Sequence, residues 1–374
     1  MLKGEFELYT EKDSFFYCAF LAALANGNTI INGVKAAPNF AEFADYLKNI
    51  GAGVNIKEEQ WEICGTNFKY GKPLDLSWVG DALPWQKRNK KIIENLLEGT
   101  PFHCEEKIAV NDSLMRELAS FGADVQWRQD GPEETDELAK RIARAQGIKN
   151  ERKWICDIAP VRSLLARDRF IAGSVSEAAF LALAASIIPN SDIVIKAVSM
   201  DASRAGIFSA FKRMGANIEI ESRHEKGNDV WGNLRVKSSQ TLIGRKFNAD
   251  MLSTCVEEIP MLASLAVFAE SETILSLPEW AASVCKNTLE NIYENLKNAG
   301  VECGLYEEGL ILRGTSEINP QNFYCGGNAI LGLALHALNK KAKGKSEVIG
   351  VECVERVYPG VLRLIEDLKW KTEN

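Results

Sequence analysis

Residues 12–56 form one predicted helix–strand–helix–strand unit, with the sequence KDSFFYCAFLAALANGNTIINGVKAAPNFAEFADYLKNIGAGVNI. The apolar run at 17–25 is too long and too rich in alanine for a strand, which favours a buried helix. A short β-branched strand follows at 29–31. Apolar residues then recur at three- and four-residue spacing over 40–47, which predicts an amphipathic helix ended by Gly51.

The same order of elements recurs along the chain. Residues 178–220 and 259–305 repeat the alanine-rich helix, the β-branched strand, the amphipathic helix and a second strand. A further copy begins at Ala329. The repeats are too long for a solenoid period, so they predict α/β units grouped into globular lobes.

A glycine ends the second helix of each full unit. The segments NIGAGVNI, SFGADVQW, RMGANIEI and NAGVECGL place these glycines at Gly51, Gly122, Gly215 and Gly300. The interval from Gly122 to Gly215 is longer than either of the others but too short for two regular spacings. Most of one unit is therefore expected to be missing there, and the charged residues 130–151 predict a helical surface connector.

Composition narrows the class of protein. The chain has 374 residues, enough for two domains with buried cores, and its net charge of −7 argues against general nucleic-acid binding. Its first residues lack an apolar signal core, and no apolar run approaches the roughly 20 residues of a spanning helix. We therefore expect a cytoplasmic protein with no membrane and no nucleic-acid partner.

The nine cysteines include no CxxC pair and are scattered through apolar segments. An odd, unclustered set favours reduced core thiols over disulfides or zinc ligands. The three histidines are far apart in the sequence. We expect no metal site and no cofactor.

Four segments resemble the enolpyruvyl transferase family. They are LAALANG at 21–27, AGSVSEAAFLALAASIIPNSDIVIKAVSMDASRAGI at 172–207, EEIPMLASLAVFAE at 257–270 and GVECVERVYPGVLRLIEDL at 350–368. They stand in the family's order and cover both ends and the centre of the chain. The resemblance is closest to the members that join phosphoenolpyruvate to shikimate 3-phosphate.

The resemblance implies an α/β fold of two lobes built from repeated βαβαββ units, arranged as an inside-out α/β barrel. The first lobe would be 12–171, with about two units plus a reduced third, of which 159–163 would be a remnant. The second lobe would be 172–374 together with 1–11 and would hold three units. The active site would lie in the cleft that the chain crosses twice between the lobes.

Family chemistry transfers the enolpyruvyl group of phosphoenolpyruvate to a hydroxyl of shikimate 3-phosphate and releases phosphate. Both substrates are multiply anionic, so the site needs arginines and lysines, plus a carboxylate and a lysine for proton transfer. By resemblance, Lys12 matches the family's lysine and Glu257 replaces its catalytic aspartate. The longer side chain moves the carboxylate by about one methylene, and roughly 1 Å of misplacement can cost on the order of 100-fold in rate.

Four further residues are substrate-binding candidates. Arg356 stands where some members have a lysine, and Arg204 matches a family arginine in SMDASRAGI, where a structural tie at a helix start is the competing interpretation. Arg162 lies in the remnant of the third unit. Tyr17 lies in the segment where the family holds phosphate.

Other family motifs are replaced. After Lys12 the family has a Ser-x-Ser-x-Arg run at a helix start that holds phosphate, whereas residues 13–17 here are DSFFY. Asp13 suits a helix start but repels phosphate. The segments at 282–288 and 326–328 keep none of the family's charges in place. Losing three phosphoenolpyruvate-binding arginines would cost about 5 to 9 kcal/mol.

Three hypotheses follow. The chain is a family enzyme with the usual reaction, a non-catalytic paralogue with a regulatory or partner-binding role, or a protein for a different, less anionic ligand. Phe15, Phe16, Tyr17 and Trp78 suggest the third, because aromatic side chains favour a flatter, more apolar ligand.

Overall fold

The structure is a computed structural model that describes residues 1–68, 73–108, 112–130, 153–226 and 229–366. The described residues form two compact units. The larger unit comprises 1–12, 33–42 and the chain from Phe170 onward, and the smaller unit comprises 13–32 and 43–169. The predicted connector at 130–151 lies outside the described residues after Asp130.

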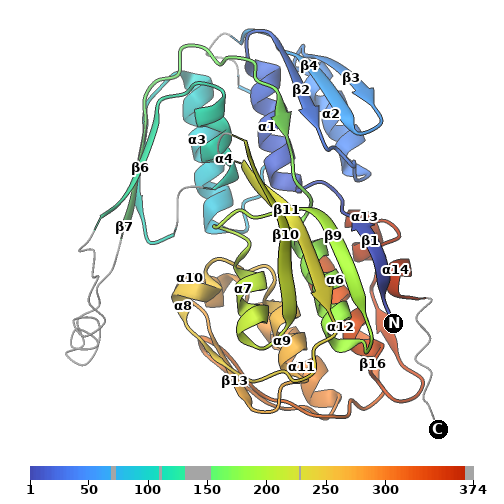
Figure 1. The fold of residues 1–374 in the computed structure, drawn as a ribbon. Coiled ribbons are helices and arrows are strands. Elements are labelled where there is room, and N and C mark those ends of the chain that lie inside the picture. The colour runs from blue at the N-terminus through green and yellow to red at the C-terminus, as the bar shows by residue number, and fades with distance from the viewer. Residues whose placement is uncertain (69–72, 109–111, 131–152, 227–228, 367–374) are drawn as a thin grey trace. The chain divides into compact units, whose positions relative to one another are not determined.

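The first repeat has the predicted order of elements (Figure 1). It consists of α1 (Lys12–Leu24), β2 (Asn28–Asn32), α2 (Asn39–Asn49), β3 (Gly53–Lys57) and β4 (Gln60–Cys64). β4 pairs antiparallel with both β2 and β3, so Ile31 and Ile56 lie opposite Trp61 on either side. The apolar positions of α1 are buried almost without interruption, as expected for an alanine-rich helix without a polar face.

The second repeat of the smaller unit contains α3 (Pro84–Glu98), β5 (Phe102–Glu106), α4 (Ser113–Ser120), β6 (Val125–Asp130) and β7 (Lys153–Ile158). β7 pairs antiparallel with β5 and with β6. Leu83 precedes a proline-started α3, whose apolar face is buried while its lysines remain outside it. The segment ends at β8 (Arg169–Phe170).

The larger unit begins with a mixed sheet in the order β1-β9-β11-β10. Its strands are β1 (Lys3–Glu7), β9 (Asp192–Ser199), β10 (Asn217–Lys226) and β11 (Asp229–Lys237), and its helices are α6 (Val175–Ile187) and α7 (Gly206–Arg213). β1 pairs parallel with β9, although the whole smaller unit lies between these strands in the sequence. The N-terminal strand is thereby part of the larger unit.

The remainder of the larger unit supplies two more repeats. The elements are β12 (Lys246–Phe247), α8 (Ala249–Leu252), α9 (Ile259–Ala266), β13 (Glu272–Ser276), α10 (Glu279–Val284), α11 (Lys286–Asn298), β14 (Glu302–Tyr306), β15 (Gly309–Arg313), β16 (Asn322–Tyr324), α12 (Ala329–Asn339), β17 (Glu347–Ile349), α13 (Glu352–Val357) and α14 (Arg363–Glu366). α6, α9 and α12 pack against one another, and α6 also packs on β9 and β11 (Figure 1). These three apolar helices form the core of the larger unit.

The helix-ending glycines have the backbone conformation that their position requires. Gly51, Gly122, Gly215 and Gly300 all have positive φ, between 83° and 103°. This left-handed conformation closes a helix and is unfavourable for residues with a Cβ atom. The sequence marker of each repeat is thus confirmed in the structure.

An aromatic cluster forms part of the smaller unit's core. Phe16 stacks on Phe43 with ring centroids 4.3 Å apart, and Trp78 lies 5.1 Å from Phe43. Phe15 is fully buried and packs edge-on against Trp61 at 4.9 Å. These side chains bind one another, so the expected aromatic ligand surface at Phe15 and Phe16 is instead packed protein interior. Within the described residues, no helix is long and apolar enough to cross a membrane.

Candidate active-site residues

An ion-pair cluster lies in the larger unit, where α9 begins; we call Arg204, Glu257, Glu258 and Ser176 the Arg204 cluster. Arg204 Nη2 forms an ion pair with Glu257 Oε2 and lies 3.4 Å from Glu258 Oε1. Ser176 donates its hydroxyl to Glu258 Oε1 at 2.6 Å. Glu258 is fully buried, whereas the side chains of Arg204 and Glu257 are 21% and 24% exposed. Two carboxylates therefore already balance the charge of this guanidinium.

The N-terminus of α6 is closed by side chains of the same unit. Ser174 is its N-cap and accepts a hydrogen bond from the Glu177 backbone N–H at 3.4 Å. Glu11 accepts one from the Val175 N–H at 3.0 Å. The first N–H groups of a helix attract phosphate because they lack partners within the helix and carry the positive end of its dipole. Here the chain supplies its own anion, the Glu11 carboxylate.

Glu177 is a buried carboxyl in the first turn of α6. Its Oε2 accepts a hydrogen bond from the Tyr9 backbone N–H at 2.7 Å. Burial raises the pKa of Glu177 to about 7, although this hydrogen bond and the charge of Lys35 oppose the shift. Tyr358 lies 3.3 Å from Ser174 through the two hydroxyls, and burial raises its pKa. A group that exchanges a proton near neutral pH therefore lies beside the helix start.

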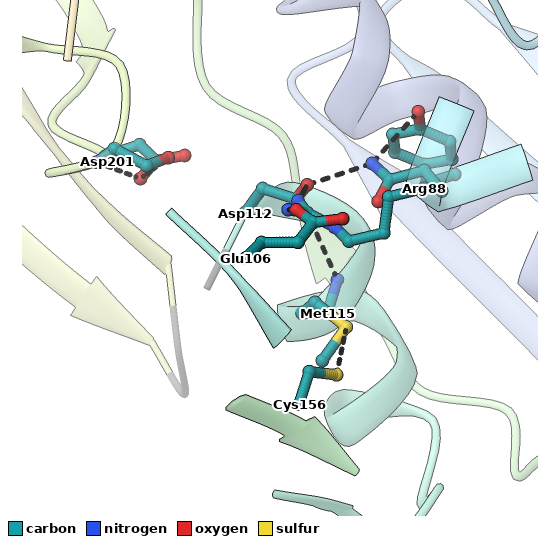
Figure 2. Close-up of polar contacts among 9 residues, drawn as sticks. Arg88, Glu106, Asp112, Met115, Cys156 and Asp201 are labelled. Atoms are coloured by element: carbon teal, nitrogen blue, oxygen red, sulfur yellow. Dashed lines mark hydrogen bonds and ion pairs between the residues drawn. The ribbon is translucent and has the colours of Figure 1, made fainter. Parts of the chain in front are cut away.

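A second arginine, Arg88, is bound by carboxylates in the smaller unit, and Figure 2 labels it together with Glu106 and Asp112. We call these three residues, with Asn89 and Tyr17, the Arg88 network. Arg88 donates to Glu106 Oε2 at 2.7 Å and also pairs with Asp112. Asn89 donates to Asp112 at 3.0 Å and to the Tyr17 hydroxyl at 3.3 Å. Burial lowers the pKa of Arg88, but the charges of Asp112 and Glu106 outweigh it and raise the pKa overall.

Asp112 has a second role as the N-cap of α4, where it accepts a hydrogen bond from the Met115 backbone N–H at 3.3 Å. The Arg88 side chain is only 1% exposed. The guanidinium is thus held inside the unit by one carboxylate from β5 and one from a helix cap. This arrangement orients Arg88 as a structural cation rather than as an exposed anion-binding group.

Four residues proposed from the sequence belong to the larger unit. Arg204 and Glu257 are brought into direct contact. Lys12 is the first residue of α1, and Arg356 lies in the last turn of α13; both side chains are exposed. The structural interpretation of Arg204 fits its position, because it binds the two glutamates immediately before α9.

The remaining two proposed residues belong to the smaller unit. Arg162 is exposed in the segment after β7. Tyr17 is 4% exposed and its hydroxyl lies in the Arg88 network. Burial raises the pKa of Tyr17 well above its usual value. The Tyr17 hydroxyl is therefore part of the buried Arg88 network and is not an exposed group.

Sequence reasoning proposed Glu257 but missed the other acidic partners of the two arginines, which are Glu258, Glu106 and Asp112. Glu258 follows Glu257 directly before an apolar helix, which is a recognisable helix-start signal. Ser174 and Glu177 have the S-x-x-E spacing of a capping box. Glu106 carries no such signal, because it lies in β5 while its partner Arg88 lies in α3, 18 residues earlier.

The fold is that of the enolpyruvyl transferases, as two solved structures show. The EPSP synthase from Acinetobacter baumannii superposes with a TM-score of 0.76 at 17% identity, covering 97% of this chain and 95% of that chain. The enolpyruvyl transferase NikO from Streptomyces tendae gives a TM-score of 0.62 at 12% identity, covering 97% and 94%.

The sequence model of EPSP synthase (3-phosphoshikimate 1-carboxyvinyltransferase) matches residues 141–364, more than half of the chain. This chain belongs to the EPSP synthase family. The 3-phosphoshikimate 1-carboxyvinyltransferase of Bacillus pumilus strain SAFR-032 is 24% identical over 421 residues, covering 98% of this chain and 97% of the relative. The same enzyme of Thermoanaerobacter sp. strain X514 is 27% identical over 420 residues, covering 98% of each.

Proposed function

We propose that this chain is a non-catalytic member of the EPSP synthase family, whose retained scaffold serves a regulatory or partner-binding role. The observation that carries this proposal is the Arg204 cluster, in which two glutamates bind the arginine that matches a family arginine. A guanidinium balanced in this way offers little net positive charge to a phosphate or carboxylate. The Arg88 network and the Glu11 carboxylate at α6 support the same conclusion.

The size of the effect can be estimated from the two arginines. A charge-assisted hydrogen bond contributes roughly 1.5 to 3 kcal/mol. If neither arginine is available to an anionic substrate, the loss is about 3 to 6 kcal/mol, or roughly 10²- to 10⁴-fold in affinity. This loss applies to phosphoenolpyruvate and to shikimate 3-phosphate alike, because both are bound through anionic groups.

The second candidate function is carboxyvinyl transfer from phosphoenolpyruvate to shikimate 3-phosphate. It is favoured by the name of the relatives that match nearly the whole chain, and by the exposed Lys12 and the partly exposed Glu257. In this alternative Lys12 and Glu257 would transfer protons, and Arg356 and Arg162 would bind substrate anions. The hypothesis of a flat, apolar ligand has less support, because Phe15 and Phe16 are buried.

Phosphate release from phosphoenolpyruvate in the presence of shikimate 3-phosphate separates the two functions. We expect the purified chain to release phosphate at least about 100-fold more slowly than the Bacillus pumilus relative assayed in parallel. Lys12→Ala should leave this residual rate unchanged, as should Lys246→Ala, an exposed control in β12. A rate close to that of the relative, abolished by Lys12→Ala but not by Lys246→Ala, would establish the enzyme instead.

Releasing Arg204 from a buried partner should restore anion binding. In Glu258→Gln the cluster loses one of its two negative charges without a change of side-chain size, so its formal net charge rises from −1 to 0 and it repels an anion less. We expect phosphoenolpyruvate to raise the Tm of this variant more than that of the unmodified chain. Glu302→Gln is the matched control, because Glu302 binds Arg313 in an exposed pair. Equal Tm shifts in all three proteins would contradict the role assigned to the cluster.

A further inference from the structure

Two thiols of the larger unit lie close enough to react with each other. Cys325 Sγ and Cys353 Sγ are 3.7 Å apart. Cys325 directly follows β16 and is fully buried, while Cys353 is half-buried in the first turn of α13. The Cys325 Sγ also lies 3.2 Å from the Ile349 carbonyl and 3.0 Å from the Gly350 carbonyl. The two thiols therefore bring the loop after β16 close to the first turn of α13, although these segments are separate in the sequence.

The surrounding backbone permits closer approach of the two sulfurs. A disulfide needs a separation of about 2.05 Å, so the sulfurs must move together by roughly 1.7 Å. Gly326 and Gly327 follow Cys325, and Gly350 precedes the helix of Cys353; all three have positive φ. Glycines tolerate the dihedral changes that such a movement requires. The helix α13 is only six residues long, which limits the structure that has to shift.

A metal ion is a weaker explanation for this pair. Among the residues that the structure describes, no group of three or more His, Cys, Asp or Glu side chains is placed to hold one. Two thiols alone fall short of the four ligands of a structural zinc site. A close thiol pair can be oxidised to a disulfide.

We propose that Cys325 and Cys353 are a redox-active dithiol, which a low-molecular-weight disulfide such as oxidised glutathione converts to an intramolecular disulfide. The half-buried Cys353 thiolate attacks the oxidant, forms a mixed disulfide and releases one glutathione thiolate. The Cys325 thiolate then attacks Cys353 Sγ and releases the second. The protein loses two electrons and two protons, and one oxidised glutathione becomes two reduced molecules.

The position of the pair gives the disulfide a consequence. Cys325 precedes Asn328, the N-cap of α12, and Cys353 lies one turn before Arg356 in α13, whose C-cap is Tyr358. The bond would hold α13 against the loop that starts α12. Burial and the neighbouring Cys325 raise the pKa of Cys353 to about 11, so the reaction should be slow at neutral pH and is best run under mildly alkaline conditions.

The test is oxidation of the full chain with oxidised glutathione at pH 8.5, followed by alkylation and peptide mass mapping. We expect a mass loss of about 2 Da, loss of two alkylatable thiols, a Cys325–Cys353 cross-link and reversal by dithiothreitol. The link should raise the Tm by roughly 5 °C, because it closes a loop of nearly thirty residues. Cys353→Ser should abolish the cross-link. Cys303→Ser should retain it, because Cys303 is also half-buried and its sulfur lies 3.9 Å from the Tyr293 carbonyl oxygen.

The exposed Cys64 reports whether the oxidant has reacted with the protein. Glutathione on Cys64 without a Cys325–Cys353 cross-link would overturn the proposal. A stable mixed disulfide on Cys353 would also overturn it, as would a cross-link confined to Cys104 and Cys156, which lie opposite each other in β5 and β7. These outcomes do not depend on ligand binding, so they are independent of the proposed function.

Discussion

Glu177 shows how one buried side chain makes stability depend on pH. Its pKa rises to about 7 because the carboxylate loses water on folding, while the usual value is 4.5. Between these values the folded chain binds more protons than the unfolded chain. The contribution of Glu177 to the free energy of unfolding therefore falls as pH rises through this window and is lowest above pH 7.

Glu177→Gln should remove this dependence. Glutamine keeps an oxygen that can accept the hydrogen bond from the Tyr9 backbone N–H but has no charge to desolvate. We expect the variant to be more stable than the unmodified chain at pH 8, by up to about 3 kcal/mol, with the difference shrinking toward pH 5. Urea denaturation at pH 5, 6, 7 and 8 measures it. Glu219→Gln, at an exposed position, should change little; a constant difference at all four pH values would refute the role of Glu177.

His336 acts in the opposite direction. It is 9% exposed in α12, and burial lowers its pKa to about 4. The unfolded chain binds the proton more readily, so stability is lost as pH falls from about 6.5 toward 4. Because this contribution is common to the Glu177→Gln variant and the unmodified chain, it cancels when their stabilities are compared at the same pH.

The Arg169–Glu117 pair is a buried ion pair whose loss we expect to destabilise the smaller unit. Two hydrogen bonds, of 3.0 and 2.8 Å, join the side chains, which are 5% and 2% exposed. Arg169→Met would leave the Glu117 carboxylate buried without its cation, at a cost of about 3 to 5 kcal/mol. Arg313→Met, in an exposed pair with Glu302, should cost less than about 1 kcal/mol. Urea denaturation at pH 7 compares them, and equal losses would contradict the effect of burial.

At the level of elements, each full repeat is marked by the glycine that ends its second helix. Gly215 has a φ of 96°, and a Cβ atom added there would lie 2.7 Å from the Thr241 carbonyl oxygen. We expect Gly215→Ala to destabilise the protein by about 1 to 2 kcal/mol or more, from the left-handed conformation and the contact together. Gly304→Ala in β14 is the control, because its Cβ would meet no atom within 4 Å. Thermal unfolding measures the Tm of both variants, and a similar Tm for the two would contradict the prediction.

The elements could be predicted because their signals are local. A long alanine-rich run, apolar spacing of three and four, and a glycine after the last turn specify α1, α2 and their strands within one short segment. The partners of Arg88 and Arg204 could not be predicted in this way. Glu106 and Glu258 lie 18 and 54 residues from their arginines, and only the packing of strands and helices brings these charges together.

On the scale of the whole molecule, the chain forms two compact units, and their ranges interleave because residues 33–42 cluster with the larger one. The lobe boundaries expected from the sequence, 12–171 and 172–374 with 1–11, stay a prediction about the functional lobes. The repeats themselves indicate why two units form. Each apolar helix needs neighbouring repeats to cover it, as α6, α9 and α12 do for one another.

Because the two units have separate cores, we expect a substitution in one unit to change hydrogen exchange in that unit alone. Arg169→Met removes a buried ion pair of the smaller unit, and Leu335→Ala removes a side chain that is 1% exposed in α12 of the larger unit. Because local opening follows contiguous cooperative units, Arg169→Met should speed hydrogen exchange in α4 and leave α6 and α9 unchanged. Leu335→Ala should do the reverse. Hydrogen exchange with mass spectrometry, at pH 7 and without denaturant, resolves the peptides of both units. If either substitution accelerates exchange equally in α4 and α9, the two cores open as one unit, and the destabilisation of one region would then be shared by the whole chain.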